Sequence, residues 1–277
     1  MYIKESFRAH IPCNHFFDGF LAVSPWAIFF DGTTAWTVNH MDIVPDWVNL
    51  TLHGLFFITM DAAIIFSTLE MVSSFATLVE NRDDSTGNHI KRTRGYVEII
   101  LQEMLETAAY RSVITKDYIE NSLNAAPMHD IGKIAIPDSI LRKPGKLTEG
   151  EFAAMKTHTV KGGEIILETF RNLDEPEYVQ IAYETARFHH EKWNGTGYPD
   201  GLAGEEIPLH ARIMAIADVF DAVSAKRCYR DAMPLDRCFE IIEQGIGTDF
   251  DPQLARMFLS AKERVINQYI RYASPKS

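Results

Sequence analysis

Five of the ten histidines in this sequence stand where their chemistry could converge, and two aspartates accompany them inside apolar stretches. The aspartates are Asp130, in "APMHDIGKIAIP", and Asp218, in "IMAIADVFDAV". A buried carboxylate needs a cation, a helix N-terminus or a metal as its partner. Imidazole and carboxylate together suit iron, manganese, cobalt, nickel or zinc. The candidate ligands are therefore Asp130 and Asp218 with His89, His129, His158, His189 and His190.

Two ions, rather than one, fit this number of donors. A carboxylate can bridge two metals, which favours Asp130 as the shared ligand, and such pairs lie about 3.5–4 Å apart and drive in-line attack on phosphorus. Lys133 follows His129 by four residues, and residues at that spacing share a helix face, so its ammonium is predicted to reach a phosphate oxygen or a leaving group. Each histidine alone fits an ordinary packed or surface residue, and only their conjunction favours a metal centre.

The elements that must position these residues are predicted to be helices throughout, because apolar residues recur at helical spacing and β-branched alternation is nearly absent. The histidines are expected at or near helix ends. The glycine-rich loop "NGTGYPDG" is expected to form at most a short hairpin. Helices are predicted for residues 60–81, 89–108, 177–190 and "ARIMAIADVFDAVSA", with helix starts at "TEGE" (148–151) and at Asp251-Pro252.

Composition limits the remaining options. A net charge of −11 over 277 residues argues against a nucleic-acid polymer as partner. Three scattered cysteines and no recognisable signal peptide favour a reducing, cytoplasmic location. The apolar run 47–69 is long enough to span a bilayer, but it contains His53 and Asp61. A buried helix is favoured there, and membrane association is the alternative.

Four long motifs resemble one family. They are "HDIGKIAIPDSILRKPGKLTEGEF", "MKTHTVKGGEII", "HHEKWNGTGYPDGLAGEEIP" and "ADVFDAVSAKRCYR". In this order they resemble HD-GYP domains, a branch of the HD metal-dependent phosphohydrolases, over about two thirds of the chain. The resemblance implies an all-α HD-type bundle with a GYP loop. The chain is then predicted to hold an unassigned N-terminal segment (1–58) that could be a divergent or truncated sensor, a connecting helix (59–82) and the HD-GYP domain (83–270).

The resemblance also implies an activity and a role for each matching residue. HD-GYP domains are phosphodiesterases that open cyclic di-GMP to linear pGpG, or to GMP after a second cut. All seven candidate ligands fall on metal positions of the family, with iron or manganese favoured and zinc, cobalt and nickel as alternatives. Asp130 and Lys133 fall on catalytic positions. The positions that contact the nucleotide are Tyr198, Arg227 and Arg230.

One departure and two alternatives remain. Some members carry a glutamate that recruits a third metal where this chain has Ser85, so a third metal is not expected. The substrate could instead be another cyclic dinucleotide such as 3′,3′-cGAMP. A non-catalytic cyclic-dinucleotide receptor or interaction module is the alternative of another class. The family further implies docking of diguanylate cyclase (GGDEF) domains on the GYP loop, and a homodimer through the connecting helix is a further expectation.

Overall fold

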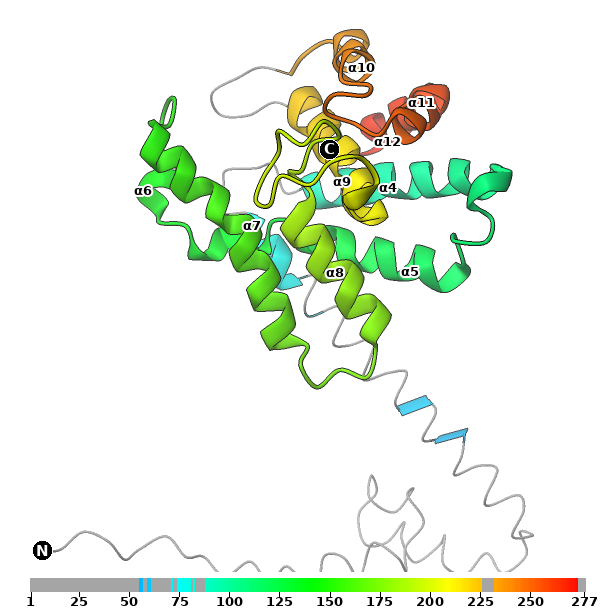
Figure 1. Cartoon of the computed structure of the whole chain (residues 1–277), viewed down its shortest axis with the longest axis horizontal. Coiled ribbons are helices and arrows are strands. Elements are labelled where there is room, and N and C mark those ends of the chain that lie inside the picture. Colours follow the sequence, from blue (N-terminus) through cyan, green and yellow to red (C-terminus); the bar gives the residue numbers. More distant parts are fainter. Residues whose placement is uncertain are drawn as a thin grey trace, which may run out of the picture. The chain divides into compact units, whose positions relative to one another are not determined.

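The computed structural model describes residues 55–56, 59–60, 71, 74–80, 82, 88–225 and 232–273. The chain divides into two compact units, residues 1–68 and 69–277, and Figure 1 shows the helices of the second unit. The predictions made for most of residues 1–58, for Ser85 and for Arg227 and Arg230 lie outside the described residues. The predicted boundaries at residues 58 and 82 stay predictions.

The described part of the second unit is built from helices and the loops between them, which confirms the all-α prediction for these residues. Residues 74–80 are also helical. From α4 onward the order is α4 (His89–Glu106), η3 (Ala108–Tyr110), α5 (Lys116–Ala125), η4 (Ala126–Met128), η5 (Ile131–Ala135), α6 (Asp138–Leu141), α7 (Glu149–Thr169), α8 (Pro176–Phe188), η6 (Gly204–Glu206), α9 (Leu209–Ser224), α10 (Leu235–Gln244), α11 (Pro252–Ser260) and α12 (Lys262–Ala273).

Local signals set the helix ends. The predicted capping box opens α7, because the Thr148 hydroxyl accepts from the amide of Glu151 and the Glu151 carboxylate accepts from the amide of Thr148. Asp251 caps α11 through the amides of Gln253 and Leu254, as its position before a proline predicted. Among the described residues, no helix combines the length and the apolar character that a membrane span requires.

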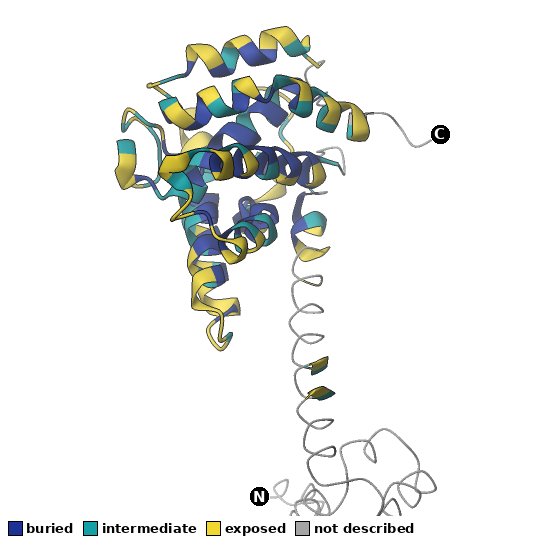
Figure 2. Cartoon of the chain, turned by 90° about the vertical axis from the view of Figure 1, so that its right-hand side faces the viewer, coloured by how far each residue is buried: buried dark blue, intermediate teal, exposed yellow. Residues whose placement is uncertain are grey.

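The core lies where α4, α9 and α11 meet. Three aromatic rings fill it, with ring centroids 5.2 Å apart for Tyr96 and Phe220 and 5.0 Å apart for Phe220 and Phe258, both in edge-to-face contact. All three side chains are fully buried. Figure 2 shows buried residues on the inner faces of the longer helices of the second unit and exposed residues on their outer faces. This rigid centre holds α4 and α9, which carry His89 and Asp218.

A second contact fixes η5 against α7. A Cβ atom added to Gly132 would lie 1.9 Å from the carbonyl oxygen of His158 and 2.4 Å from the amide nitrogen of Gly162. Only glycine therefore allows the two backbones to approach this closely. The contact brings Asp130, at the start of η5, next to His158 on α7.

The surroundings of two predicted residues differ from expectation. His158 lies in the middle of α7 rather than near its end, because the helix continues to Thr169. His129 and Lys133 do not share one α-helix, since η5 is a 3₁₀ helix that begins after Asp130. The tighter turn places residues i and i+3 in line, so Lys133 lies against Asp130.

Candidate metal centre

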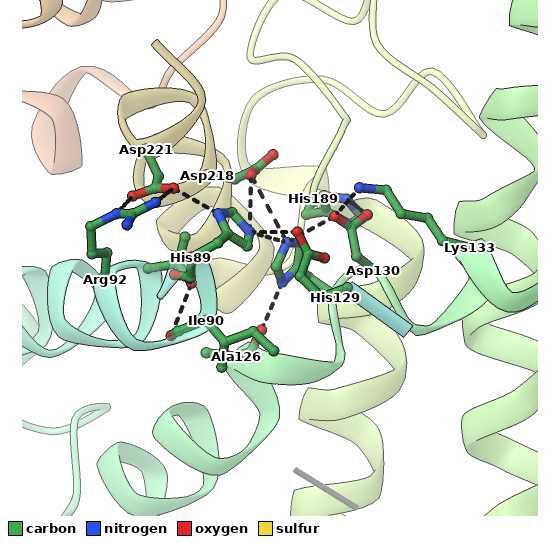
Figure 3. A network of polar contacts seen from close by, with 12 residues as sticks. His89, Ile90, Arg92, Ala126, His129, Asp130, Lys133, His189, Asp218 and Asp221 are labelled. Atoms are coloured by element: carbon green, nitrogen blue, oxygen red, sulfur yellow. Dashed lines mark hydrogen bonds and ion pairs between the residues drawn. The ribbon is translucent and has the colours of Figure 1, made fainter. Parts of the chain in front are cut away.

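The Asp130 carboxylate lies between imidazoles from three other points of the chain. Its Oδ2 atom is 3.2 Å from Nε2 of His129, and its Oδ1 atom is 3.3 Å from Nε2 of His158 and 3.8 Å from Nε2 of His189. The ligand atoms of Asp130, His158, His189 and His190 all lie within 4.8 Å of one another. Figure 3 shows the Asp130 carboxylate between His129, His189 and the Lys133 ammonium.

The other side of the cluster is formed by α4 and α9. His89, His129 and Asp130 form a second set with ligand atoms within 4.8 Å of one another. Nε2 of His89 is 3.3 Å from Nε2 of His129, and Oδ1 of Asp218 is 3.9 Å from both nitrogens. Metal–ligand bonds of about 2.0–2.2 Å place two ligands of one ion roughly 3–4.3 Å apart. These separations are therefore those of groups that can share an ion.

Backbone carbonyls orient three of the imidazoles. Nδ1 of His129 is 2.9 Å from the carbonyl oxygen of Ala126, and Nδ1 of His158 is 2.8 Å from that of Met155. Nδ1 of His189 is 3.0 Å from the carbonyl oxygen of Thr185. A carbonyl only accepts, so each Nδ1 donates and each Nε2 offers its lone pair to the centre when the ring is neutral.

A carboxylate orients the fourth imidazole. Nδ1 of His89 lies 2.7 Å from Oδ2 of Asp221, and Asp221 in turn accepts two hydrogen bonds from the Arg92 guanidinium, at 2.5 and 2.9 Å. All three side chains are buried. Figure 3 shows Arg92 and Asp221 on one side of His89 and His129 on the other. This chain of contacts is the carboxylate–histidine arrangement that commonly supports a metal ligand.

The pKa values of the histidines differ between the two sides of Asp130. Burial lowers the pKa of His158 and of His190, and lowers that of His189 to about 3, so these imidazoles are neutral near pH 7. Burial acts the same way on His129, but the nearby carboxylates of Asp130 and Asp218 outweigh it and raise its pKa to about 9. Burial disfavours the ionised form of Asp130, but Lys133 and His129 hold its pKa well below the usual range.

The unused hydrogen-bonding capacity of the cluster fits a metal. Oδ1 of Asp130, Nε2 of His158 and Nε2 of His189 are fully buried and make no hydrogen bond with the described part of the chain. A buried polar atom without a partner is costly. Here the three atoms face one another, and each is a good ligand for a divalent transition metal. The residues present therefore fit the ions that the sequence predicted.

The loop that follows α8 is held down by Glu191. This buried side chain accepts hydrogen bonds from the amides of Asp200, at 2.7 Å, and Gly201, at 3.0 Å. A Cβ atom added to Gly197 would lie 2.3 Å from the amide nitrogen of Lys192. Asn194 and Ala203 form an isolated antiparallel bridge, where the sequence predicted at most a short hairpin.

The held loop places Tyr198 beside the cluster. Its ring stacks on His190, with centroids 4.8 Å apart and planes at 29°. The exposed ring of Phe152 meets Tyr198 edge-on at 6.4 Å. The Lys156 ammonium lies within 6 Å of both rings, at 5.4 Å from that of Phe152 and 5.7 Å from that of Tyr198. One face of Tyr198 is thus occupied by His190, which the sequence did not predict.

The structure brings all seven predicted ligands, Lys133 and Tyr198 to one region, whereas Arg227 and Arg230 lie outside the described residues. The supporting pair Arg92 and Asp221 was not predicted. Asp221 did leave a signal, since it lies three residues after Asp218 in an apolar helix and so needs a buried partner of its own. Nothing in the sequence pairs it with an arginine 129 positions away.

Comparison with known proteins decides the family. A model of the HD domain matches residues 70–254, which is more than half of the chain. The chain belongs to the HD domain family. The predicted resemblance to HD-GYP proteins is confirmed, since this HD domain has relatives named as cyclic di-GMP phosphodiesterases.

Three relatives of this HD domain protein illustrate the range of names. It is 43% identical over 209 residues to the probable cyclic di-GMP phosphodiesterase of Vibrio cholerae serotype O1, covering 75% of this chain and 47% of that protein. It is 43% identical over 192 residues to 3′3′-cGAMP-specific phosphodiesterase 2 of the same organism, covering 69% and 34%. It is 36% identical over 215 residues to the cyclic di-GMP phosphodiesterase of Thermotoga maritima, covering 78% and 54%. The chain spans about half or less of the length of these relatives.

Proposed function

We propose that this chain is a metal-dependent phosphodiesterase that hydrolyses cyclic di-GMP to linear pGpG. The observation that carries the proposal is the position of Asp130, whose two carboxylate oxygens face two separate sets of histidines. In the proposal each set holds one divalent ion, with Asp130 shared between them. The names of the relatives support a cyclic dinucleotide as substrate.

The proposal assigns the ligands by side. His158, His189 and His190 would hold one ion, His89, His129 and Asp218 would hold the other, and Asp130 would serve both. When bound, such a pair lowers the pKa of a water and stabilises the charge of the leaving oxygen. Iron or manganese is the proposed occupant. A third ion is not part of the proposal, because Ser85 supplies no carboxylate.

The remaining roles belong to groups around the cluster. Lys133 has its ammonium 2.7 Å from Oδ2 of Asp130, where it can hold a phosphate oxygen or give a proton to the leaving oxygen. Tyr198 orients His190 by stacking and borders the nucleotide. Arg227 and Arg230 are proposed to bind phosphate through their guanidinium forks. Docking of a GGDEF domain and a homodimer stay predictions.

Turnover of two nucleotides tests the proposal. Protein loaded with manganese should convert cyclic di-GMP to pGpG, with the product resolved from GMP by chromatography. The same assay with 3′,3′-cGAMP tests the second candidate, which is favoured by the relative at 43% identity that carries that name. Metal-replete protein that binds either nucleotide without cleaving it would instead identify a receptor.

A further inference from the structure

A carboxylate outside the seven predicted ligands also faces the metal centre. Oε1 of Glu80 lies 3.9 Å from Nε2 of His89, the nitrogen that faces the ions. This is the distance at which Asp218 lies from the same nitrogen. Glu80 is only 5% exposed, which is unusual for a glutamate.

Packing on one side of Glu80 sets its position. Residues 74–80 are helical, and residues 76, 79 and 80 share a face at spacings of four and three. Ala76 and Val79 on this face are buried in the hydrophobic core, whereas Phe75 and Leu78 on the other faces are exposed. The helix therefore points Glu80 inward together with its two core residues.

The Arg82 side chain, two residues after Glu80, also holds this segment in place. The Arg82 guanidinium donates to the carbonyl oxygen of Ile134 at 3.2 Å and to the Asp138 carboxylate at 2.6 Å. Ile134 belongs to η5, which begins directly after the bridging Asp130. The segment that carries Glu80 is thus tied to the same element that presents Asp130 and Lys133.

We propose that Glu80 is a carboxylate ligand of the ion on the His89 side of the centre. This inference rests on the two-ion site proposed above. Its separation of 3.9 Å from Nε2 of His89 is within the roughly 3–4.3 Å expected for two ligands of one ion. A hard carboxylate also suits iron or manganese. The helical residues 74–80 then contribute to the proposed metal site.

A structural role for Glu80 makes a different prediction. Glu80 could serve as the partner of a protonated His89 in the metal-free protein, without ever contacting an ion. Removal of its charge would then destabilise the metal-free protein and leave metal affinity unchanged. A ligand role predicts that removing the charge weakens metal binding and does not lower the stability of the metal-free protein. The reason is that a buried carboxylate near Asp130 and Asp218 is repelled until an ion is bound.

Metal affinity of Glu80→Gln separates the two roles. The change keeps the size of the side chain and removes its charge. Glu106→Gln is the matched control, since Glu106 is exposed at the end of α4. Equilibrium dialysis against Mn²⁺ with elemental analysis gives the affinity of each ion, and urea unfolding in EDTA gives the metal-free stability.

The expected result is specific. One of the two ions should bind at least tenfold more weakly to Glu80→Gln, the other ion and the control should match the wild type, and the metal-free midpoint should not fall. Glu80→Asp, which keeps the carboxylate, should recover part of the affinity. Two ions bound to Glu80→Gln with wild-type affinity, or a loss confined to metal-free folding, would overturn the inference. A wild-type protein that binds no Mn²⁺ would instead overturn the two-ion site itself.

Discussion

Nδ1 of His89 donates a hydrogen bond to Asp221 across 2.7 Å, and this contact determines which nitrogen of His89 faces the candidate metal centre. It joins the first residue of α4 to the last turn of α9. The other oriented imidazoles use backbone carbonyls, which no substitution removes. His89 alone among them depends on a side chain, so Asp221 is the point at which orientation can be tested by mutation.

Asp221→Asn should weaken the binding of one ion about 10–100-fold, because loss of a group that orients a ligand commonly has that effect. The substitution keeps the shape of the side chain but no longer favours the His89 tautomer that carries its proton on Nδ1. Mn²⁺ titration of the purified protein measures the change. Asp236→Asn, at an exposed carboxylate on α10, is the control. Equal affinities for the two variants would contradict the role given to Asp221.

Gly132→Ala should lower the free energy of unfolding by about 1–3 kcal/mol or more, because its Cβ would overlap the α7 backbone. Gly150→Ala is the matched control. Gly150 lies in the first turn of α7 with no atom within 4 Å of an added Cβ, so alanine should stabilise the protein by about 0.5–1 kcal/mol. Urea unfolding measures both. Equal changes at the two glycines would show that η5 and α7 are not held as close as the structure places them.

Glu191→Ala should release the loop after α8, since two amides lose their acceptor. Hydrogen exchange resolved at Asp200 and Gly201 should become at least tenfold faster, in line with the loss of a net hydrogen-bond free energy of about 1.5–3 kcal/mol to a charged acceptor. Glu191→Gln retains an acceptor oxygen and should stay nearer the wild type. Unchanged exchange in the alanine variant would remove Glu191 as the anchor of the GYP loop.

Glu151 should make the stability of α7 sensitive to acid. The Lys143 ammonium and the amide and hydroxyl of Thr148 lower the pKa of Glu151 from 4.5 to about 2. A carboxylate whose pKa is lower in the folded state stabilises the protein above its unfolded pKa, and that contribution is lost as the pH falls from about 4.5 to about 2. The stability difference between wild type and Glu151→Gln, measured in EDTA, should therefore shrink over this range. A difference that is constant with pH would contradict this pKa.

The sequence predicted the helical character of the described residues, two helix starts and the candidate ligands where each left a local signal. The Thr148–Glu151 capping box and the Asp251-Pro252 pair act within one turn of the chain. Asp130 and Asp218 were recognisable since an acid in an apolar stretch needs a partner. These signals require no knowledge of the tertiary structure.

Other features depend on tertiary contacts that leave no local pattern. The pairing of Asp221 with Arg92 joins residues 129 positions apart, and Glu80 becomes part of the site only because its helix packs on the core. The 3₁₀ geometry of η5 was mistaken for an α-helix, since the close approach at Gly132 depends on α7. Supporting residues of this kind are set by the fold rather than by motif spacing.

Asp130 is proposed to be shared by two ions. Elemental analysis of protein loaded with manganese and then dialysed tests this sharing, with Asp130→Ala beside the wild type. We expect about two ions per wild-type chain, and fewer than one in the variant because both sets lose a ligand. Asp130→Ala protein that is folded and still retains two ions would show that Asp130 is not shared.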